Sequence, residues 1–167
     1  GLGGEKGGGD QRPWKPVIEG NLIRAKVTYA DLRVLKALPD LRKLYIRRTG
    51  ITNAGLAQLA GLSRLEELDL TKTAVTDAGL EQLKGLSQLQ ELSLFETQVT
   101  GSGLNHLKGL PRLDRLYLDL SPVNDEGLAA IATRPALFSL SIAHTKTPNE
   151  GLRHMRTTTH LPNITTN

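Results

Sequence analysis

Residues 65–80 read LEELDLTKTAVTDAGL, and this stretch decides the fold. Leucine and aspartate alternate over residues 68–70, as they do in a short strand with one buried face. The second half runs into Leu80, and Leu83 and Leu86 continue it at helical spacing. The stretch therefore predicts a strand followed by a helix.

The same stretch recurs along the chain with a period of 24 residues. Three columns of leucine or isoleucine agree in five copies: Leu41, Leu65, Leu89, Leu113 and Leu137; Leu44, Leu68, Leu92, Leu116 and Leu140; Ile46, Leu70, Leu94, Leu118 and Ile142. Two further columns follow, one of hydroxyl residues and one of glycine: Thr49, Thr73, Thr97, Ser121 and Thr145; Gly55, Gly79, Gly103, Gly127 and Gly151. Because one copy cannot bury its own leucines, the copies must stack, and strands joined by helices form a parallel sheet.

The repeat divides the chain into three parts. Residues 17–160 are predicted to form six units of 24 residues, of which residues 17–40 are a weaker copy that caps the N-terminal end. The glycine-rich residues 1–16 are predicted to be a flexible linker or N-terminal segment. Residues 161–167 are predicted to be a tail or a truncated repeat, which closes the stack as a short strand or marks the removal of further repeats.

The pattern Leu-x-x-Leu-x-Leu-x-x-Thr-x-Val-Thr-Asp-Ala-Gly-Leu resembles the leucine-rich repeat family, in its bacterial and ribonuclease-inhibitor-like branches with a helix in every repeat. The sequence departs from the family at the hydroxyl column, where the family usually has asparagine or cysteine. The resemblance implies an α/β solenoid with a concave parallel β-sheet and convex helices, and a role in protein contacts.

Residue types at the ends of the helices predict how each helix starts and stops. Thr76 is placed to cap a helix with its side-chain oxygen, and Asp77 puts negative charge in the first turn. Asp31 follows Thr28 by three positions, as in a short capping box. Glycines that follow the helices are predicted to end them in the left-handed conformation: Gly61, Gly85 and Gly109. The other glycine column is predicted to let neighbouring helices approach, or alternatively to form turns.

The length and composition of the chain are typical of one soluble domain that folds without disulfide bonds. The chain has 167 residues, 38% of them hydrophobic, and no cysteine, so disulfides and thiolate zinc sites are excluded. The absence of cysteine fits a bacterial protein or a reducing compartment, and so favours the cytoplasm. No apolar run is long enough to span a membrane, and neither a signal peptide nor an anchor is visible, so we expect no membrane partner.

Sequence motifs for catalysis or metal binding are missing. The four histidines lack metal-ligand spacing: His106, His144, His154 and His160. Residues 1–9 contain glycine without the Gly-Lys-Ser or Gly-Lys-Thr of a phosphate loop. We therefore expect no enzyme, no metal, no cofactor and no small-molecule substrate.

Candidate binding residues lie between the leucines of each strand, because alternate side chains of a strand point to opposite faces. Tyr45, Phe95 and Tyr117 occupy these outward positions, although aromatic side chains belong by default in a core. Aromatic and arginine side chains dominate interface hot spots, so the predicted protein-binding face comprises Tyr45, Arg47, Arg48, Asp69, Phe95, Arg115, Tyr117 and Asp119. The alternative is that the aromatic residues only pack against neighbouring strand side chains.

Charge is concentrated in residues 41–64, which contain five cations and no acidic residue. The 24-residue register places Arg42 opposite Glu66 and Lys43 opposite Glu67, which predicts two cross-strand ion pairs. Arg47 and Arg48 face Thr71 and Lys72 and are predicted to remain free for an acidic patch on a partner. Acidic repeats interrupt any basic stripe, so nucleic acid is not expected.

These features favour a non-catalytic module that binds a protein or peptide on the concave face of its sheet. Two alternatives remain open. The chain is an interaction segment of a larger enzyme or signalling protein, or it is a structural spacer that associates with copies of itself.

Overall fold

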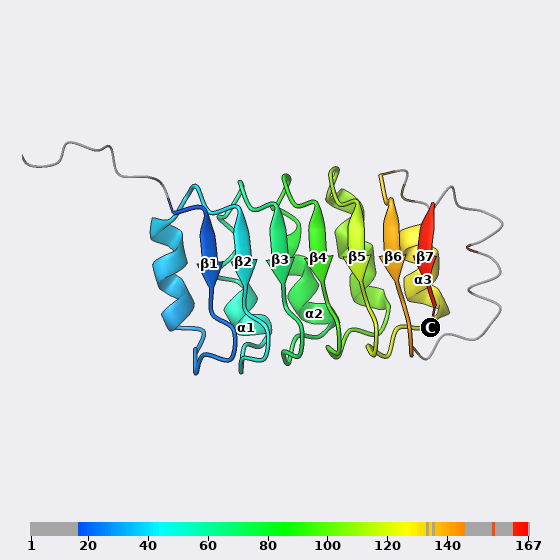
Figure 1. Cartoon of the computed structure of the whole chain (residues 1–167), viewed down its shortest axis with the longest axis horizontal. Helices are drawn as coiled ribbons and strands as arrows, with labels where there is room; N and C mark the ends of the chain where they lie inside the picture. Colours follow the sequence, from blue (N-terminus) through cyan, green and yellow to red (C-terminus); the bar gives the residue numbers. More distant parts are fainter. Residues whose placement is uncertain (1–16, 133, 135, 146–154, 156–161, 167) are drawn as a thin grey trace, which may run out of the picture.

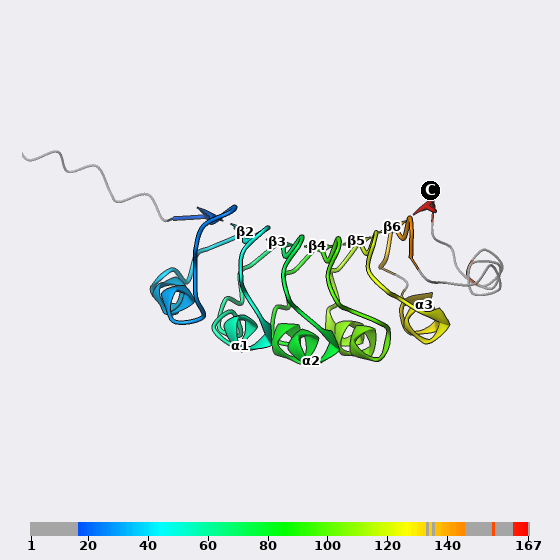
Figure 2. The same ribbon diagram turned by 90° about the horizontal axis from the view of Figure 1, so that it is seen from below.

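The protein is a stack of strand-and-return units, seen in a computed structural model that describes residues 17–132, 134, 136–145, 155 and 162–166. The strands form one parallel sheet whose order follows the chain from β1 to β7 (Figure 1). The labelled helices lie on one side of this sheet, and the sheet bows so that its helix-free face is concave (Figure 2). The predicted α/β solenoid, with strands on the concave side and helices on the convex side, is confirmed.

Each strand begins 24 residues after the strand before it and pairs with it in the register that the repeat predicts. The strands are β1 (Glu19–Asn21), β2 (Lys43–Tyr45), β3 (Glu67–Asp69), β4 (Glu91–Ser93), β5 (Arg115–Tyr117), β6 (Ser139–Ser141) and β7 (Asn163–Thr165). Leu44 pairs with Leu68, for example, and Leu140 pairs with Ile164. The partial seventh unit therefore contributes a short strand at the end of the described sheet.

The returns between strands contain short helices, many of them 3₁₀ helices. They are η1 (Asp31–Ala37), α1 (Asn53–Leu56), α2 (Asp77–Leu80), η2 (Glu81–Leu83), η3 (Ser102–Gly109) and α3 (Asp125–Ala132). A 3₁₀ helix rises about 2.0 Å per residue and an α-helix about 1.5 Å, so a 3₁₀ segment covers the return path with fewer residues. A helical segment in each of the first five units agrees with the prediction.

The core consists of the repeated aliphatic columns. Leu44, Leu92, Leu116 and Leu140 have no exposed surface, and Leu68 has only 1%. No aromatic residue belongs to the described core cluster, which contains leucine, isoleucine, valine, alanine and one methionine. Leucine side chains therefore supply the apolar burial that holds the units together.

The hydroxyl column satisfies backbone carbonyls at the bend after each strand. Thr49 donates to the carbonyl oxygen of Ile46 at 2.8 Å, and Thr73 donates to that of Leu70 at 2.7 Å. Thr97 and Thr145 make the equivalent bonds, at 2.9 and 3.0 Å. Because these positions are largely buried, water cannot donate hydrogen bonds to the carbonyl oxygens there. The threonine hydroxyls donate these hydrogen bonds instead.

The prediction that Gly61, Gly85 and Gly109 adopt the left-handed conformation is wrong, since none of the described glycines has a φ in the left-handed region. Left-handed residues instead follow the strands at the 24-residue period: Arg24, Arg48, Lys72, Glu96, Leu120 and His144, with φ between 53° and 58°. Five of them donate their backbone N–H to the next strand, as Arg48 does to the carbonyl of Thr71 at 2.8 Å. This ladder bond and the turn together offset a conformational cost of about 1–2 kcal/mol at each position.

The second glycine column allows neighbouring helices to approach. A Cβ added at Gly103 would lie 2.5 Å from the Cα of Asp77, and a Cβ added at Gly127 would lie 2.7 Å from the Cα of Gly101. Real Cβ atoms do not come this close to backbone. Of the two roles predicted for this column, the structure shows close approach between helices.

Helix starts differ from the prediction in one respect. Thr76 is the residue that precedes α2, but its side chain makes no capping bond; its hydroxyl accepts a hydrogen bond from Asn53 Nδ2 at 2.8 Å. Asp31 does bond back to Thr28, accepting from the backbone N–H at 2.7 Å and from the hydroxyl at 2.8 Å. The contact between Asp31 and Thr28 is therefore present, but η1 begins at Asp31, and Ala30, the residue before it, makes no side-chain capping bond.

Candidate functional site

The concave face carries the side chains that alternate with the buried leucines. In β2 to β6 the central leucine is buried and the residues on either side are half-buried. Pairing aligns these outward residues into two rows: Asn21, Tyr45, Asp69, Ser93, Tyr117 and Ser141; Glu19, Lys43, Glu67, Glu91, Arg115 and Ser139. Neighbours within a row lie about 4.8 Å apart along the sheet.

Tyr45 is held on this face by the neighbouring strand. Its hydroxyl donates to Glu67 Oε2 at 3.0 Å, and Lys43 Nζ lies 2.6 Å from Glu67 Oε1. The hydrogen bond from Lys43 is the main reason that the pKa of Glu67 is lower than usual. Burial and the bond to Glu67 raise the pKa of Tyr45, so its phenol is neutral at physiological pH.

Arg47 is not free, which corrects the prediction made from the 24-residue register. Its Nε lies 3.0 Å from Asp69 Oδ2, which belongs to the adjacent strand but is 22 residues away in sequence. Asp69 Oδ1 also accepts the backbone N–H of Thr71 at 2.9 Å. The sheet therefore neutralises Arg47 and fixes the orientation of Asp69.

The residues predicted on β5 are also tied to their surroundings. Arg115 Nε lies 3.0 Å from Glu91 Oε2 and 3.5 Å from Asp114 Oδ1. Tyr117 is half-buried beside this cluster, and burial raises the pKa of its phenol. Phe95 lies two positions beyond the end of β4 and is also half-buried. Tyr45 and Tyr117 therefore lie on β2 and β5, and Phe95 lies in the loop that follows β4.

Asp119 differs from the other predicted site residues because only 9% of its surface is exposed. Its Oδ1 accepts hydrogen bonds from Ser141 Oγ at 2.6 Å and from the backbone N–H of Ala143 at 2.9 Å. The carboxylate therefore joins β5 to the next unit and offers little surface to a partner.

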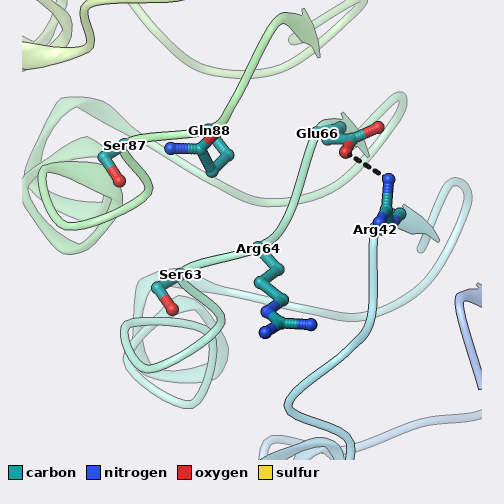
Figure 3. A pocket seen from close by; sticks show the side chains of 6 residues that line it. All are labelled: Arg42, Ser63, Arg64, Glu66, Ser87 and Gln88. Atoms are coloured by element: carbon teal, nitrogen blue, oxygen red, sulfur yellow. Dashed lines mark hydrogen bonds and ion pairs between the residues drawn. The ribbon is translucent and has the colours of Figure 1, made fainter. Parts of the chain in front are cut away.

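The cross-strand ion pairs predicted from the register are confirmed. Arg42 Nη1 lies 3.0 Å from Glu66 Oε1, and Lys43 pairs with Glu67. A cavity of about 500 Å³ opens beside Arg42 at the amino ends of the strands (Figure 3). Its second arginine, Arg64, pairs with Asp40, so the cations around this cavity are neutralised.

A second cavity, of about 580 Å³, lies at the carboxyl ends of β1 and β2. It is lined by Arg24, Lys26, Tyr29 and Arg48, together with backbone and hydroxyl groups of the same two loops. Arg48 was predicted to be free, and its side chain has no partner within the described part of the chain. Sequence reasoning missed Arg24, although the 24-residue period places it directly beside Arg48.

The buried cation of the described residues is structural. Arg134 is 9% exposed and donates to the backbone carbonyls of Leu107 and Leu110 at the end of η3. Burial lowers the pKa of its guanidinium. Its contacts satisfy carbonyls left open by the end of the helix.

The described residues hold no group of three or more histidine, aspartate or glutamate side chains positioned to bind a metal ion. Among the same residues, no helix has the length and apolar character needed to cross a bilayer.

Comparisons with known proteins agree with the repeat and with the fold. Residues 39–99 match the family model described as leucine rich repeat. The structure resembles internalin C2 of Listeria monocytogenes, with a TM-score of 0.66 and 25% identity over 90% of this chain and 71% of that one. It also resembles the internalin inlF of the same organism, with a TM-score of 0.60 and 22% identity over 90% of this chain and 49% of that one. No curated protein matches the sequence significantly.

Residues 39–99 therefore contain leucine-rich repeats, and the described fold is that of a leucine-rich repeat solenoid. Its relatives by structure are bacterial proteins, and the family and these relatives indicate a protein-interaction module.

Proposed function

We propose that the protein is a non-catalytic module that binds a protein or peptide on the concave face of its sheet. The observation that supports this most directly is the placement of the aromatic residues. The core cluster contains none, whereas Tyr45, Phe95 and Tyr117 stand half-buried on the outward face. Aromatic side chains in this position provide apolar area that a partner can cover.

Preorganisation is the proposed mechanism. The parallel sheet fixes the backbone, and Glu67, Asp69 and Glu91 hold Tyr45, Arg47 and Arg115 in place before a partner arrives. Ordering such side chains on association otherwise costs about 0.5–1.5 kcal/mol each. A face ordered in advance avoids part of that cost.

The partner is proposed to present an acidic patch beside the aromatic residues. Arg47 and Arg115 already have carboxylate partners, so Arg48 is the predicted site cation left to meet such a patch. The same face serves equally if the module is an interaction segment of a larger enzyme or signalling protein.

The decisive experiment is a pull-down from a lysate of the source organism, with the native chain compared with a Tyr45→Ala, Phe95→Ala, Tyr117→Ala variant. A matched control removes exposed apolar side chains that lie outside the predicted binding face: Val34→Ala, Leu120→Ala and Phe138→Ala. Circular dichroism first confirms that both variants are folded. We expect a protein that the native chain and the control capture and the aromatic variant does not.

Capture of the same proteins by all three chains, or of none by the native chain, would refute binding on the concave face. Self-association would then become the favoured function. One observation supports that alternative: the first unit, at the end of the described sheet, leaves about half or more of Val17, Ile18 and Val34 exposed. A molar mass that rises with concentration in light scattering would identify it.

A further inference from the structure

Three cations line the cavity at the carboxyl ends of β1 and β2 without a carboxylate among its lining residues. They are Arg24, Lys26 and Arg48, and the aromatic ring of Tyr29, which is 51% exposed, stands beside them. Arg24 and Arg48 occupy equivalent left-handed positions, at φ 58° and 57°. Their backbone N–H groups donate to the carbonyl oxygens of Arg47 and Thr71 in the next units, at 3.0 and 2.8 Å. These hydrogen bonds fix the backbone from which both side chains extend.

Charge elsewhere on the sheet is paired between neighbouring units. Arg42, Lys43 and Arg47 each contact a carboxylate of the next unit, and so does Lys72, whose Nζ lies 2.6 Å from Glu96 Oε2. Lys72 occupies the same left-handed column as Arg24 and Arg48. In the third and fourth units, Lys72 and Glu96 of this column therefore pair with each other. In the first and second units, the column contains two arginines and no carboxylate.

In the cavity at the amino ends of the strands, by contrast, the arginines are paired with carboxylates. This cavity also contains two arginines, but Arg42 contacts Glu66 (Figure 3), and Arg64 contacts Asp40. Arg24 and Arg48 lie at equivalent positions in the loops that follow the adjacent strands β1 and β2, and their like charges repel each other. A carboxylate placed between them would remove that repulsion and gain hydrogen bonds from two guanidinium groups.

We propose that this cavity binds the carboxylates of an acidic peptide segment, with Tyr29 packing against the segment's aliphatic atoms. Arg24, Lys26 and Arg48 form this basic pocket. The inference rests on the proposed function in that the ligand is part of a protein. It extends the acidic contact proposed at Arg48 to Arg24 and Lys26, at the edge of the sheet, and states the chemistry that this region recognises.

The test measures fluorescence anisotropy of a rhodamine-labelled oligoglutamate peptide titrated with the full chain, and with an Arg24→Gln, Lys26→Gln, Arg48→Gln variant. The matched control neutralises three exposed cations on the helical side: Arg33→Gln, Lys36→Gln and Lys108→Gln. Both variants carry the same net charge. Oligoglutamine and a single-stranded DNA oligonucleotide serve as the other ligands.

We expect oligoglutamate to bind the native chain and the control alike, and the pocket variant roughly tenfold more weakly, since exposed ion pairs each contribute a few-fold. Oligoglutamine should not bind, and high salt should weaken the interaction. Equal losses in both variants, no loss in the pocket variant, or DNA binding as tight as that of oligoglutamate would each overturn the proposal. The Tyr45, Phe95 and Tyr117 variant should still bind oligoglutamate, so a failure here is distinguishable from a failure of the concave face.

Discussion

At the junctions between helices, a side chain at the first helical position reaches into the next unit. Asn53 accepts the backbone N–H of Thr76 at 2.9 Å and donates to its hydroxyl at 2.8 Å. Asp77 accepts the backbone N–H of Thr100 at 3.1 Å and also accepts from its hydroxyl. The series stops at Gly101, which has no side chain. These residues therefore act as caps for the following unit rather than for their own helix.

Asp77→Asn should preserve this junction, because Asn53 makes the same contacts with an amide. Its oxygen can accept from the Thr100 N–H while its nitrogen faces the Thr100 hydroxyl. Asp77→Ala removes the contacts to Thr100 and also those to Gly101 and Ser102, and should lower the free energy of unfolding by about 1–2 kcal/mol, as loss of a helix cap does. Urea denaturation at neutral pH measures the difference, and an equal loss in both variants would contradict the assignment.

Low pH should reduce the stability that the ionised carboxylate of Asp77 contributes. Burial opposes ionisation of Asp77, but hydrogen bonds from Thr100, Gly101 and Gly103 outweigh it and hold the pKa below its ordinary value of 3.8. A depressed pKa in the folded state contributes stability above the unfolded value, and this contribution is lost as the pH falls through the folded pKa. The stability difference between the native chain and Asp77→Asn should therefore shift against the native chain below about pH 3.8. Denaturation curves measured across that range test the sign.

Ser121, in the hydroxyl column, joins its own unit to the preceding one. Its Oγ donates to the Leu94 carbonyl at 2.6 Å and accepts the backbone N–H of Thr97 at 3.0 Å. Ser121→Ala leaves that buried N–H without a partner and should cost about 1–3 kcal/mol. Thermal unfolding followed by calorimetry measures the loss, and an unchanged midpoint would show that the hydroxyl contributes nothing.

At the scale of elements, the distance between neighbouring helices depends on glycine. Gly103→Ala places a methyl group 2.5 Å from the backbone of Asp77 in α2 and should destabilise the protein by about 1–3 kcal/mol, as overpacking does. Gly109→Ala is the matched control, because a Cβ there meets nothing within 4 Å. It should be neutral or stabilising by up to about 1 kcal/mol. Paired chemical denaturation compares the two, and equal effects would contradict close packing of the helices.

The sequence predicted those parts of each element that follow from a strict period. The strands, their register, the leucine core and the pairs Arg42–Glu66 and Lys43–Glu67 all follow from counting 24 residues. The contact between Arg47 and Asp69 was missed because it joins residues 22 apart, diagonally across two strands. Strand twist brings such diagonal neighbours within reach of long side chains.

The left-handed column was missed for a different reason. Residue type gives no signal there, since the column contains arginine, lysine, glutamate, leucine and histidine. The conformation is imposed by the backbone bond to the next strand, as between Leu120 and Ala143 at 2.9 Å. Glycine was expected because it adopts this conformation at no cost. The repeated geometry outweighs the preference of the individual residue.

For the molecule as a whole, each unit is stabilised by its neighbours, so a defect in the middle should weaken the entire stack. Leu92 lies in β4, the central strand of the described sheet, and is fully buried. Leu92→Ala should lower the free energy of unfolding by about 2–5 kcal/mol through the cavity that it leaves. Stability in repeat proteins is the sum of the units and their interfaces, which is why a central cavity weakens contacts on both sides.

The aromatic residues of the concave face should behave in the opposite way. Tyr45, Phe95 and Tyr117 are half-buried and lie outside the core cluster, so each alanine substitution should cost clearly less than Leu92→Ala. A buried aromatic side chain would instead cost about 3–5 kcal/mol. Urea denaturation of the single variants separates the two cases. Losses of about 3–5 kcal/mol would show that the aromatic residues stabilise the sheet, and would contradict their role in a binding face. Small losses would agree with apolar surface that is available to a partner.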